Sequence, residues 1–356
     1  MRIAIVHIKG MPMHSTSWVA PWTDYCETNG IEYEHVNLME GDAVGILKKF
    51  DIVLWHFGLY NLRAMLFARS ILYTAKMMGL KVFPDFKESW HFDDKVAEMY
   101  ALKAVGAPIP ESSVYYSYSS LEKDVNSGIL TFPIVAKLRN GAGSHNVKLI
   151  KTGGDLLSYG KTMLKGKGFN AAPSLIFKAS SNIRSSHSKG DFIKKFHRIP
   201  EFLRTLKGAK QFPREKGYVY LQEFIPNEGY DMKVVVVGNK CSGLIRPVRS
   251  HDFRASGGGE VFFDKKYFTP EIIRSAFETT DKLGTQCIGY DYVVNKETGE
   301  GKIVEMSYGF AHTAVMASGG YFDRDCVWHE EPLNAPAEII KNMTNQVAMQ
   351  ESLQVP

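Results

Sequence analysis

Residues 1–90 alternate short β-rich apolar runs with longer amphipathic stretches, and this alternation limits the fold more than any other feature of the chain. Residues 62–78 space apolar side chains among polar ones, as a helix does. Strand–helix–strand alternation predicts a parallel sheet covered on both faces, so we expect an α/β domain here. The β-rich runs, each short enough for a strand, cover 2–6, 31–36, 51–57 and 80–83.

The sequence changes character after residue 90. A helix is expected from about Asp93 to Gly106, because Pro108 and Pro110 stop it. Beyond it, short β-rich runs are joined by turns with few helices between them, which predicts an α+β region with helices on one side of its sheet. These runs lie at 114–118, 132–138, 218–225, 232–237, 242–248, 290–294 and 303–306.

Composition restricts the class of protein. With 44% hydrophobic and 23% charged residues, the chain has the composition of a globular protein and not of a disordered, collagen-like or coiled-coil one. No apolar run reaches the roughly 18–20 residues that span a bilayer, and the opening run is too short for a signal peptide. Neither a disulfide framework nor a zinc site is expected, and we expect a cytoplasmic protein, because the cysteines are far apart. They are Cys26, Cys241, Cys287 and Cys326.

A strand that ends in lysine before a glycine-rich loop suggests a phosphate-binding element. Lys137 projects from an otherwise apolar strand face, and a buried ammonium is costly unless an anion neutralises it. Gly141, Gly143 and Ser144 follow, and small residues let backbone N–H groups approach phosphate oxygens. A solvated lysine before a surface turn fits the same residues, and neither the P-loop nor the dinucleotide fingerprint is present.

A second group of residues combines an apolar strand edge with a charged hairpin. The strand at 218–225 stops at a proline and leaves backbone groups with which an adenine ring can pair. A two-residue turn at 238–239 sets Asp231 opposite Arg246 and puts Lys233 on the same face. Asp231 can hold ribose hydroxyls, although an ordinary cross-strand salt bridge explains the same pair.

The strongest indication of chemistry is a pair of carboxylates on another hairpin. If Val294 pairs with Lys302 across the intervening loop, Asp291 lies opposite Glu305, and cross-strand Cβ atoms are about 4.5–5.5 Å apart. Such carboxylates repel each other unless a cation lies between them, and oxygen ligands suit Mg²⁺ that is also bound to substrate phosphates. Ser307 falls on the same face and adds a hydroxyl. The alternative is that one carboxylate reaches solvent.

Arginines precede a triple glycine at 257–259. Arg246, Arg249 and Arg254 lead into these glycines. Planar guanidinium groups suit a phosphoryl group in transfer, because the charge that shifts during the reaction must be neutralised.

In this order along the chain, the motifs resemble those of the ATP-grasp superfamily from about Asp94 to Gly309. The matching segments are Asp94-Lys95 at a helix start, FPIVAKL with its glycine loop, LQEFI, GYDMKVVVVG, DFRASGGG, and GYDYVV followed by IVEMSYGF. The branches most similar in texture are D-alanine–D-alanine ligase and ribosomal-protein glutamyl ligase. The resemblance implies an ATP-grasp fold with a preceding parallel α/β domain, divided at 1–90, 91–220 and 221–356.

Carried over residue by residue, the resemblance implies a site for ATP and Mg²⁺. The implied phosphate ligands are Lys95, Lys137, Gly141, Gly143 and Ser144; the adenine hinge is the backbone of Glu223 and Ile225 with Gln222 beside it; Asp231 binds ribose; Asp291, Glu305 and Ser307 hold the metal; and Lys233, Arg246 and Arg254 are catalytic. Most relatives have Glu-x-Asn where this chain has Glu305-Met-Ser307. That departure leaves open whether one or two metal ions bind.

The implied activity is ATP-dependent ligation of a small-molecule carboxylate to an amine through an acyl phosphate. Two alternatives remain, an ATP-grasp kinase that phosphorylates a hydroxyl and a non-catalytic ATP-binding protein. His312, Asp323 and Glu330 follow the metal strand and are candidates for holding the amine. The EMSYGF ending and a basic insertion also resemble a bacterial subgroup associated with surface-polysaccharide synthesis, an analogy at the level of the fold.

The basic insertion lies at 161–216 and holds fourteen Lys and Arg against three Asp and Glu, whereas the rest of the chain is net acidic. It lacks the interleaved aromatic residues of a recognised nucleic-acid-binding module, so no nucleic-acid partner is expected. A solvated helix pair and a surface for an anionic acceptor are the two alternatives. The oligomeric state stays open, with a homodimer among the alternatives.

Overall fold

The structure, a computed structural model, describes residues 1–7, 17–58, 62–141, 146–170, 214–248 and 261–353. The residues Gly143, Ser144 and Arg254, for which the sequence predicts roles, lie outside the described residues, as does most of the basic insertion. None of the described helices is long and apolar enough to cross a membrane.

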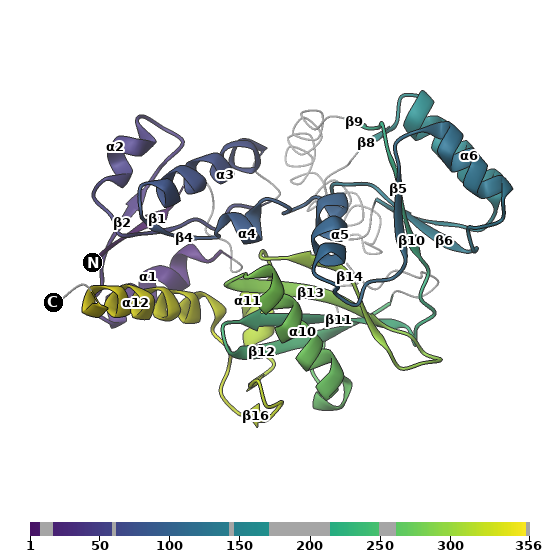
Figure 1. Cartoon of the computed structure of the whole chain (residues 1–356). Helices are drawn as coiled ribbons and strands as arrows, with labels where there is room; N and C mark the ends of the chain where they lie inside the picture. The colour runs from purple at the N-terminus through teal and green to yellow at the C-terminus, as the bar shows by residue number, and fades with distance from the viewer. Residues whose placement is uncertain (8–16, 59–61, 142–145, 171–213, 249–260, 354–356) are drawn as a thin grey trace, which may run out of the picture.

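The N-terminal region is the expected parallel α/β layer. Its sheet has the order β2-β1-β3-β4, and every neighbouring pair is parallel. Figure 1 shows α1 on one face of this sheet and α3 on the other. The central strand β1 is apolar along most of its length because both of its faces are covered. The elements are β1 (Arg2–Val6), α1 (Val19–Thr28), β2 (Glu32–Val36), α2 (Ala43–Leu47), β3 (Ile52–Leu54), α3 (Leu62–Met77) and β4 (Lys81–Phe83).

Two helices then lead to a second, antiparallel sheet with the order β5-β10-β6-β7. The strand expected at 114–118 ends at Tyr115, because Ser117 caps the next helix by accepting a hydrogen bond from the N–H of Ser120. Strand β10 runs across the boundary expected between residues 220 and 221. The elements are α4 (Phe86–Ser89), α5 (Lys95–Ala104), β5 (Ser112–Tyr115), α6 (Tyr118–Asn126), β6 (Ile134–Lys137), β7 (Val147–Ile150), α7 (Gly153–Gly160), a π-helical turn (Lys161–Lys165), β8 (Phe169–Asn170), β9 (Arg214–Glu215) and β10 (Val219–Glu223).

The third sheet, also antiparallel, has the order β14-β13-β11-β12-β15-β16. The helix α10 packs on it (Figure 1), beginning at the cap Thr269 and ending at Gly284. The elements are β11 (Tyr230–Val237), β12 (Lys240–Pro247), a 3-10 turn (Lys265–Tyr267), α10 (Pro270–Leu283), β13 (Cys287–Val294), β14 (Gly301–Ser307), α11 (His312–Met316), β15 (Tyr321–Phe322), β16 (Trp328–His329) and α12 (Ala335–Leu353).

The register of the first predicted hairpin is confirmed, and that of the second differs at its loop end. In β11–β12, Asp231 faces Arg246, as the two-residue turn requires. In β13–β14, Val294 pairs with Gly301 and not with Lys302. A bulge between Asp291 and Tyr292 then shifts the register by one residue, and Asp291 still faces Glu305.

Two separate apolar cores hold these sheets. One core joins the N-terminal sheet to the third sheet, and the other lies beneath the second sheet. The C-terminal helix α12 returns to the N-terminal layer beside α1 (Figure 1), where the indole N–H of Trp22 donates to the Pro336 carbonyl at 3.2 Å. Charged side chains gather where α5, β6 and the third sheet meet, between the two cores.

Candidate functional site

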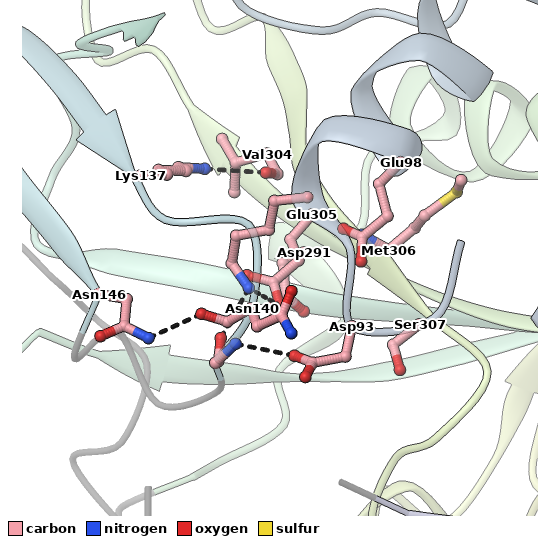
Figure 2. A network of polar contacts seen from close by, with 12 residues as sticks. Asp93, Glu98, Lys137, Asn140, Asn146, Asp291, Val304, Glu305, Met306 and Ser307 are labelled. Carbon is pink, nitrogen blue, oxygen red and sulfur yellow. Dashed lines mark hydrogen bonds and ion pairs between the residues drawn. The ribbon is translucent and has the colours of Figure 1, made fainter. Parts of the chain in front are cut away.

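Cationic and anionic side chains from the second and third sheets meet at the start of α5. Figure 2 shows Lys137 reaching toward Val304, with Asp291, Glu305 and Asp93 nearby. The strands supply Lys137 from β6, Asp291 from β13 and Glu305 from β14. The structure therefore brings the predicted phosphate lysine close to the predicted metal carboxylates.

Lys137 is a buried cation at the end of β6. Its Nζ donates to Gln222 Oε1 at 2.6 Å and to the Val304 carbonyl at 2.9 Å. Val304 is the extra residue of the bulge in β14, so its carbonyl is turned out of the ladder toward the lysine. Burial lowers the pKa of Lys137 to about 8, an effect that Glu305 opposes and Lys95 reinforces. An ammonium in this position gains from a further anion.

Lys95 lies at the start of α5 and is only 4% exposed. Its Nζ lies 3.3 Å from Glu305 Oε1 and donates to the Gly141 carbonyl at 2.7 Å. Burial alone would lower the pKa of Lys95, but the charges of Glu305 and Glu98 outweigh burial and the pKa is raised. Lys95 is therefore held in its charged form.

Two acids in this group were missed by the sequence reasoning. Glu98 lies three residues after Lys95 on one face of α5, a spacing that could have drawn attention to it. Burial raises the pKa of Glu98 well above its usual range, and Glu305 adds to the shift. One Glu98 oxygen accepts the N–H of Met306 at 3.3 Å. Asp93 carried no signal beyond its place at the start of a predicted helix. Its Oδ1 accepts the N–H of Gly141 at 2.9 Å.

Asp291 is held by two cations that the sequence predicts to be catalytic. Lys233 forms an ion pair with one of its oxygens, and Arg246 Nη2 lies 2.9 Å from the other. Burial alone would raise the pKa of Asp291, but Arg246 and Lys233 reverse that effect and lower it to about 2. Asp291 is consequently an anion throughout the neutral range.

The same guanidinium holds Asp231. Arg246 donates from Nε to Oδ1 at 2.6 Å and from Nη2 to Oδ2 at 2.9 Å. Burial raises the pKa of Asp231 to about 6, although Arg246 acts in the opposite direction. Because both oxygens accept from Arg246, Asp231 reaches a ribose hydroxyl only through a remaining lone pair.

The predicted adenine hinge begins with the last residue of β10, Glu223, and continues just beyond the strand. Gln222 is buried, and its Nε2 lies 3.2 Å from the Tyr220 hydroxyl and 3.3 Å from Ser112 Oγ. The N–H of Glu223 donates to the Glu111 carbonyl at 2.8 Å, and the Ile225 carbonyl accepts from Asn227 Nδ2 at 3.3 Å.

Asp291 and Glu305 fit a magnesium ion that takes its other ligands from phosphates. They supply oxygen donors from facing strands, and Mg²⁺ usually takes only one or two protein carboxylates. Across the described residues, no group of three or more His, Cys, Asp or Glu side chains could form a metal site on its own. Ser307 Oγ makes hydrogen bonds with the N–H and the carbonyl of Gly309 at 3.0 and 3.1 Å, so its role in metal binding stays a prediction.

The three candidate amine-binding residues are dispersed. His312 is buried against Trp18, and its Nε2 lies 3.3 Å from the Ser17 carbonyl. Asp323 lies 2.7 Å from His329 in the C-terminal hairpin. Glu330 is exposed and lies 3.7 Å from Lys265. Asp323 thus pairs within the β15–β16 hairpin, Glu330 pairs with the 3-10 turn, and neither contact includes His312.

No protein-family model matches the chain. No curated protein matches its sequence. Solved structures do match nearly its whole length. A D-alanine–D-alanine ligase from Bacillus anthracis, complexed with ATP, has a TM-score of 0.55 at 13% identity and covers 99% of both chains.

Two further structures agree with this match. A RimK-domain ATP-grasp protein from Sphaerobacter thermophilus has a TM-score of 0.52 at 16% identity, over 96% of this chain and 99% of that one. A D-cycloserine synthetase has a TM-score of 0.55 at 11% identity, over 98% and 100%. The chain thus has the ATP-grasp fold, with a parallel α/β layer before it, as the resemblance in sequence implied.

Proposed function

We propose that this protein is an ATP-dependent ligase that joins a carboxylate to an amine through an acyl phosphate. The observation that carries the proposal is the convergence of two buried lysines, Lys95 and Lys137, on the facing carboxylates Asp291 and Glu305. The fold supports it, because solved structures with this fold include a D-alanine–D-alanine ligase complexed with ATP and a D-cycloserine synthetase.

Each step uses groups of the kind found here. A carboxylate oxygen attacks the γ-phosphorus, the bond to the β-phosphate oxygen breaks, and ADP leaves. The amine nitrogen then attacks the acyl carbon, phosphate leaves with the bonding electron pair, and the amine loses a proton. Mg²⁺, when held by Asp291 and Glu305, would neutralise phosphate charge, and Lys95 and Lys137 would orient the phosphates.

No side chain has to act as a nucleophile, so the work of the protein is to position substrates and neutralise charge. Lys233 and Arg246 serve this purpose beside Asp291, and Arg254, outside the described residues, is proposed to steady the phosphoryl group in transfer. The hinge at Glu223 and Ile225, with Gln222 beside it, is proposed to receive the adenine.

The decisive experiment measures ADP and inorganic phosphate released from ATP with acids and amines supplied singly and in pairs. A screen of amino acids against sugar acids covers both the simple case and the proposed role in surface-polysaccharide synthesis. A ligase releases both products only when acid and amine are present together, and hydroxylamine traps its acyl phosphate as a hydroxamate. ADP release without free phosphate would identify a kinase, and ATP binding without turnover would identify a non-catalytic protein.

The basic insertion suggests that the acceptor is anionic. Fourteen cationic residues in 161–216 outnumber three acidic ones, which would attract a nucleotide-linked or lipid-linked uronic acid. Added salt should then weaken acceptor binding more than ATP binding, because long-range attraction is screened more than contact within a buried site. Equal salt sensitivity of the two affinities would argue against this acceptor.

A further inference from the structure

Asp93 adopts a backbone conformation that is unfavourable for a residue with a side chain. Its φ is +57°, in the left-handed region, and the other described non-glycine residue with positive φ is Cys326. Glycine adopts this region freely, whereas a Cβ atom makes it costly. Such residues gather at functional sites, where the side chain gives something that glycine cannot.

The Asp93 side chain accepts a hydrogen bond from Gly141, the first glycine of the predicted phosphate loop. Its Oδ1 accepts the N–H of Gly141 at 2.9 Å, and Gly141 itself has a φ of +117°, which only glycine adopts readily. A Cβ at Gly141 would also overlap the side-chain amide of Asn146, which donates to the Asn140 carbonyl at 2.7 Å. The start of the loop therefore has one narrowly defined conformation, and Figure 2 shows Asp93, Asn140 and Asn146 around it.

Two further hydrogen bonds join the same short segments, and both come from Lys95. Its backbone N–H donates to the Arg139 carbonyl at 3.0 Å, and its Nζ donates to the Gly141 carbonyl at 2.7 Å. If Lys95 binds a phosphate, its Nζ is drawn away from that carbonyl. The bond from Gly141 to Asp93 does not involve the lysine head group, so it does not have to break when a phosphate takes that group.

We propose that Asp93 is a positioning residue, which holds Gly141 in place and so orients Gly141 and its hydrogen-bond partner Lys95 for nucleotide binding. This inference rests on the proposed function, because it assumes that the nucleotide binds at Lys95. It also changes the expectation that the N–H of Gly141 binds phosphate. That N–H already donates to Asp93, so the phosphates take other donors.

Two substitutions at Asp93 separate the hydrogen bond from the backbone strain. Asp93→Gly removes the acceptor and relieves the strain, so the fold should lose little stability while ATP affinity falls about tenfold, the size expected when a buried N–H loses its acceptor. Asp93→Asn keeps an acceptor oxygen and tolerates the left-handed region, so its ATP affinity should stay within about twofold of the parent.

Cys326→Gly is the matched control. Cys326 has a φ of +63° and is partly exposed in the C-terminal hairpin, so this change relieves a similar strain away from the site. It should leave the ATP dissociation constant unchanged. Thermal unfolding of all variants reports stability, and calorimetric titration of the full chain with ATP and Mg²⁺ reports affinity.

Hydrogen exchange without nucleotide gives a readout independent of ATP. The Gly141 amide should exchange about tenfold faster in Asp93→Gly and at the parent rate in Asp93→Asn. If the parent chain binds ATP and Asp93→Gly binds it equally well, the positioning role is wrong. A loss of affinity in Asp93→Asn equal to that in Asp93→Gly would also overturn it, because charge and not the hydrogen bond would then matter. If the parent chain fails to bind ATP, the proposed function itself fails.

Discussion

Oppositely charged side chains in the candidate site neutralise one another. The predicted metal ligand Glu305 is paired with the predicted phosphate ligand Lys95, and Asp291 is paired with Lys233 and Arg246. A cavity of about 10 Å³ beside Lys95 and Glu305 has room for about one water. If ATP and Mg²⁺ bind here as proposed, they must displace these ion pairs, with phosphate replacing carboxylate at the lysines and Mg²⁺ replacing lysine at the carboxylates.

This exchange predicts opposite effects of Glu305→Gln with and without metal. In EDTA, ATP should bind about threefold more tightly than to the parent chain, because Lys95 loses a partly exposed competitor. With Mg²⁺, turnover should be lost, because a metal ligand is gone. Equilibrium dialysis measures the first effect and ADP release the second. Glu338→Gln, which removes a partner of the distant Lys240, is the control, and unchanged metal-free affinity in Glu305→Gln would contradict the exchange.

Lys137 predicts a pH dependence of nucleotide affinity. Burial holds its pKa at about 8, well below the ordinary value for lysine, so the ammonium is present below about pH 8 and is lost as the pH rises through it. ATP affinity should be constant up to about pH 7 and fall by about tenfold toward pH 9. Lys137→Met should bind ATP weakly without this trend, whereas Lys103→Met, on an exposed position of α5, should keep it. A flat parent profile would show that Lys137 does not bind phosphate.

Among the elements, the β11–β12 hairpin shows what the sequence can predict. A two-residue Gly-Asn turn leaves one register, and the predicted pair Asp231–Arg246 is present, with Val237 opposite Lys240 at the turn. The loop between β13 and β14 is longer, so the sequence does not determine which residues pair across it to better than one position. The pair Asp291–Glu305 was predicted from a register that is wrong at the loop, and it exists because the bulge at Val304 compensates.

The helix α10 and two contacts in the candidate site were not predicted from the sequence. Thr269-Pro270 and Gly284 mark the start and end of α10. This helix was not predicted, because the β-rich runs before and after it indicated a region made mainly of strands. The carbonyl that Lys137 uses comes from the bulge residue Val304, 167 positions away, and Asp93, in its left-handed conformation, contacts Gly141, 48 positions away. Spacing along the chain does not predict such contacts, because they depend on how the sheets pack.

The β11–β12 hairpin also depends on a glycine that leaves no room for a side chain. A Cβ at Gly243 would overlap the Lys233 carbonyl and lie 2.8 Å from the Phe268 ring. Gly243→Ala should lower the free energy of unfolding by about 1–3 kcal/mol, measured by urea denaturation. Gly154→Ala, in α7, meets only Thr152 Oγ1 at 4.0 Å and should be neutral or stabilising, since alanine favours helices. Equal stability of the two variants would refute the close approach.

Across the whole molecule, the N-terminal layer and the third sheet share one apolar core, and a carboxyl group is buried where they join. Glu88 of α4 is fully buried and accepts the backbone N–H of Gln286, which precedes β13. Gln286 Nε2 in turn donates to the Val82 carbonyl of β4 at 3.0 Å. The contact between the two layers is thus polar at its centre. Protonation of the Glu88 carboxyl therefore affects both layers.

Glu88 predicts that the two layers hold together less strongly as the pH rises. Burial raises the pKa of Glu88 to about 7, although the N–H of Gln286 acts to lower it. Because the folded state binds this proton more tightly than the unfolded state, the stabilisation is complete below about pH 4.5 and is lost as the pH rises through about 7. Glu88→Gln keeps an acceptor without the charge, so it should exceed the parent by about 2 kcal/mol in unfolding free energy at pH 8.5 and by little at pH 5. Urea denaturation at both pH values tests this, with Glu278→Gln on the exposed face of α10 as the control. A difference between Glu88→Gln and the parent that stays constant with pH would mean that Glu88 does not titrate at the joint.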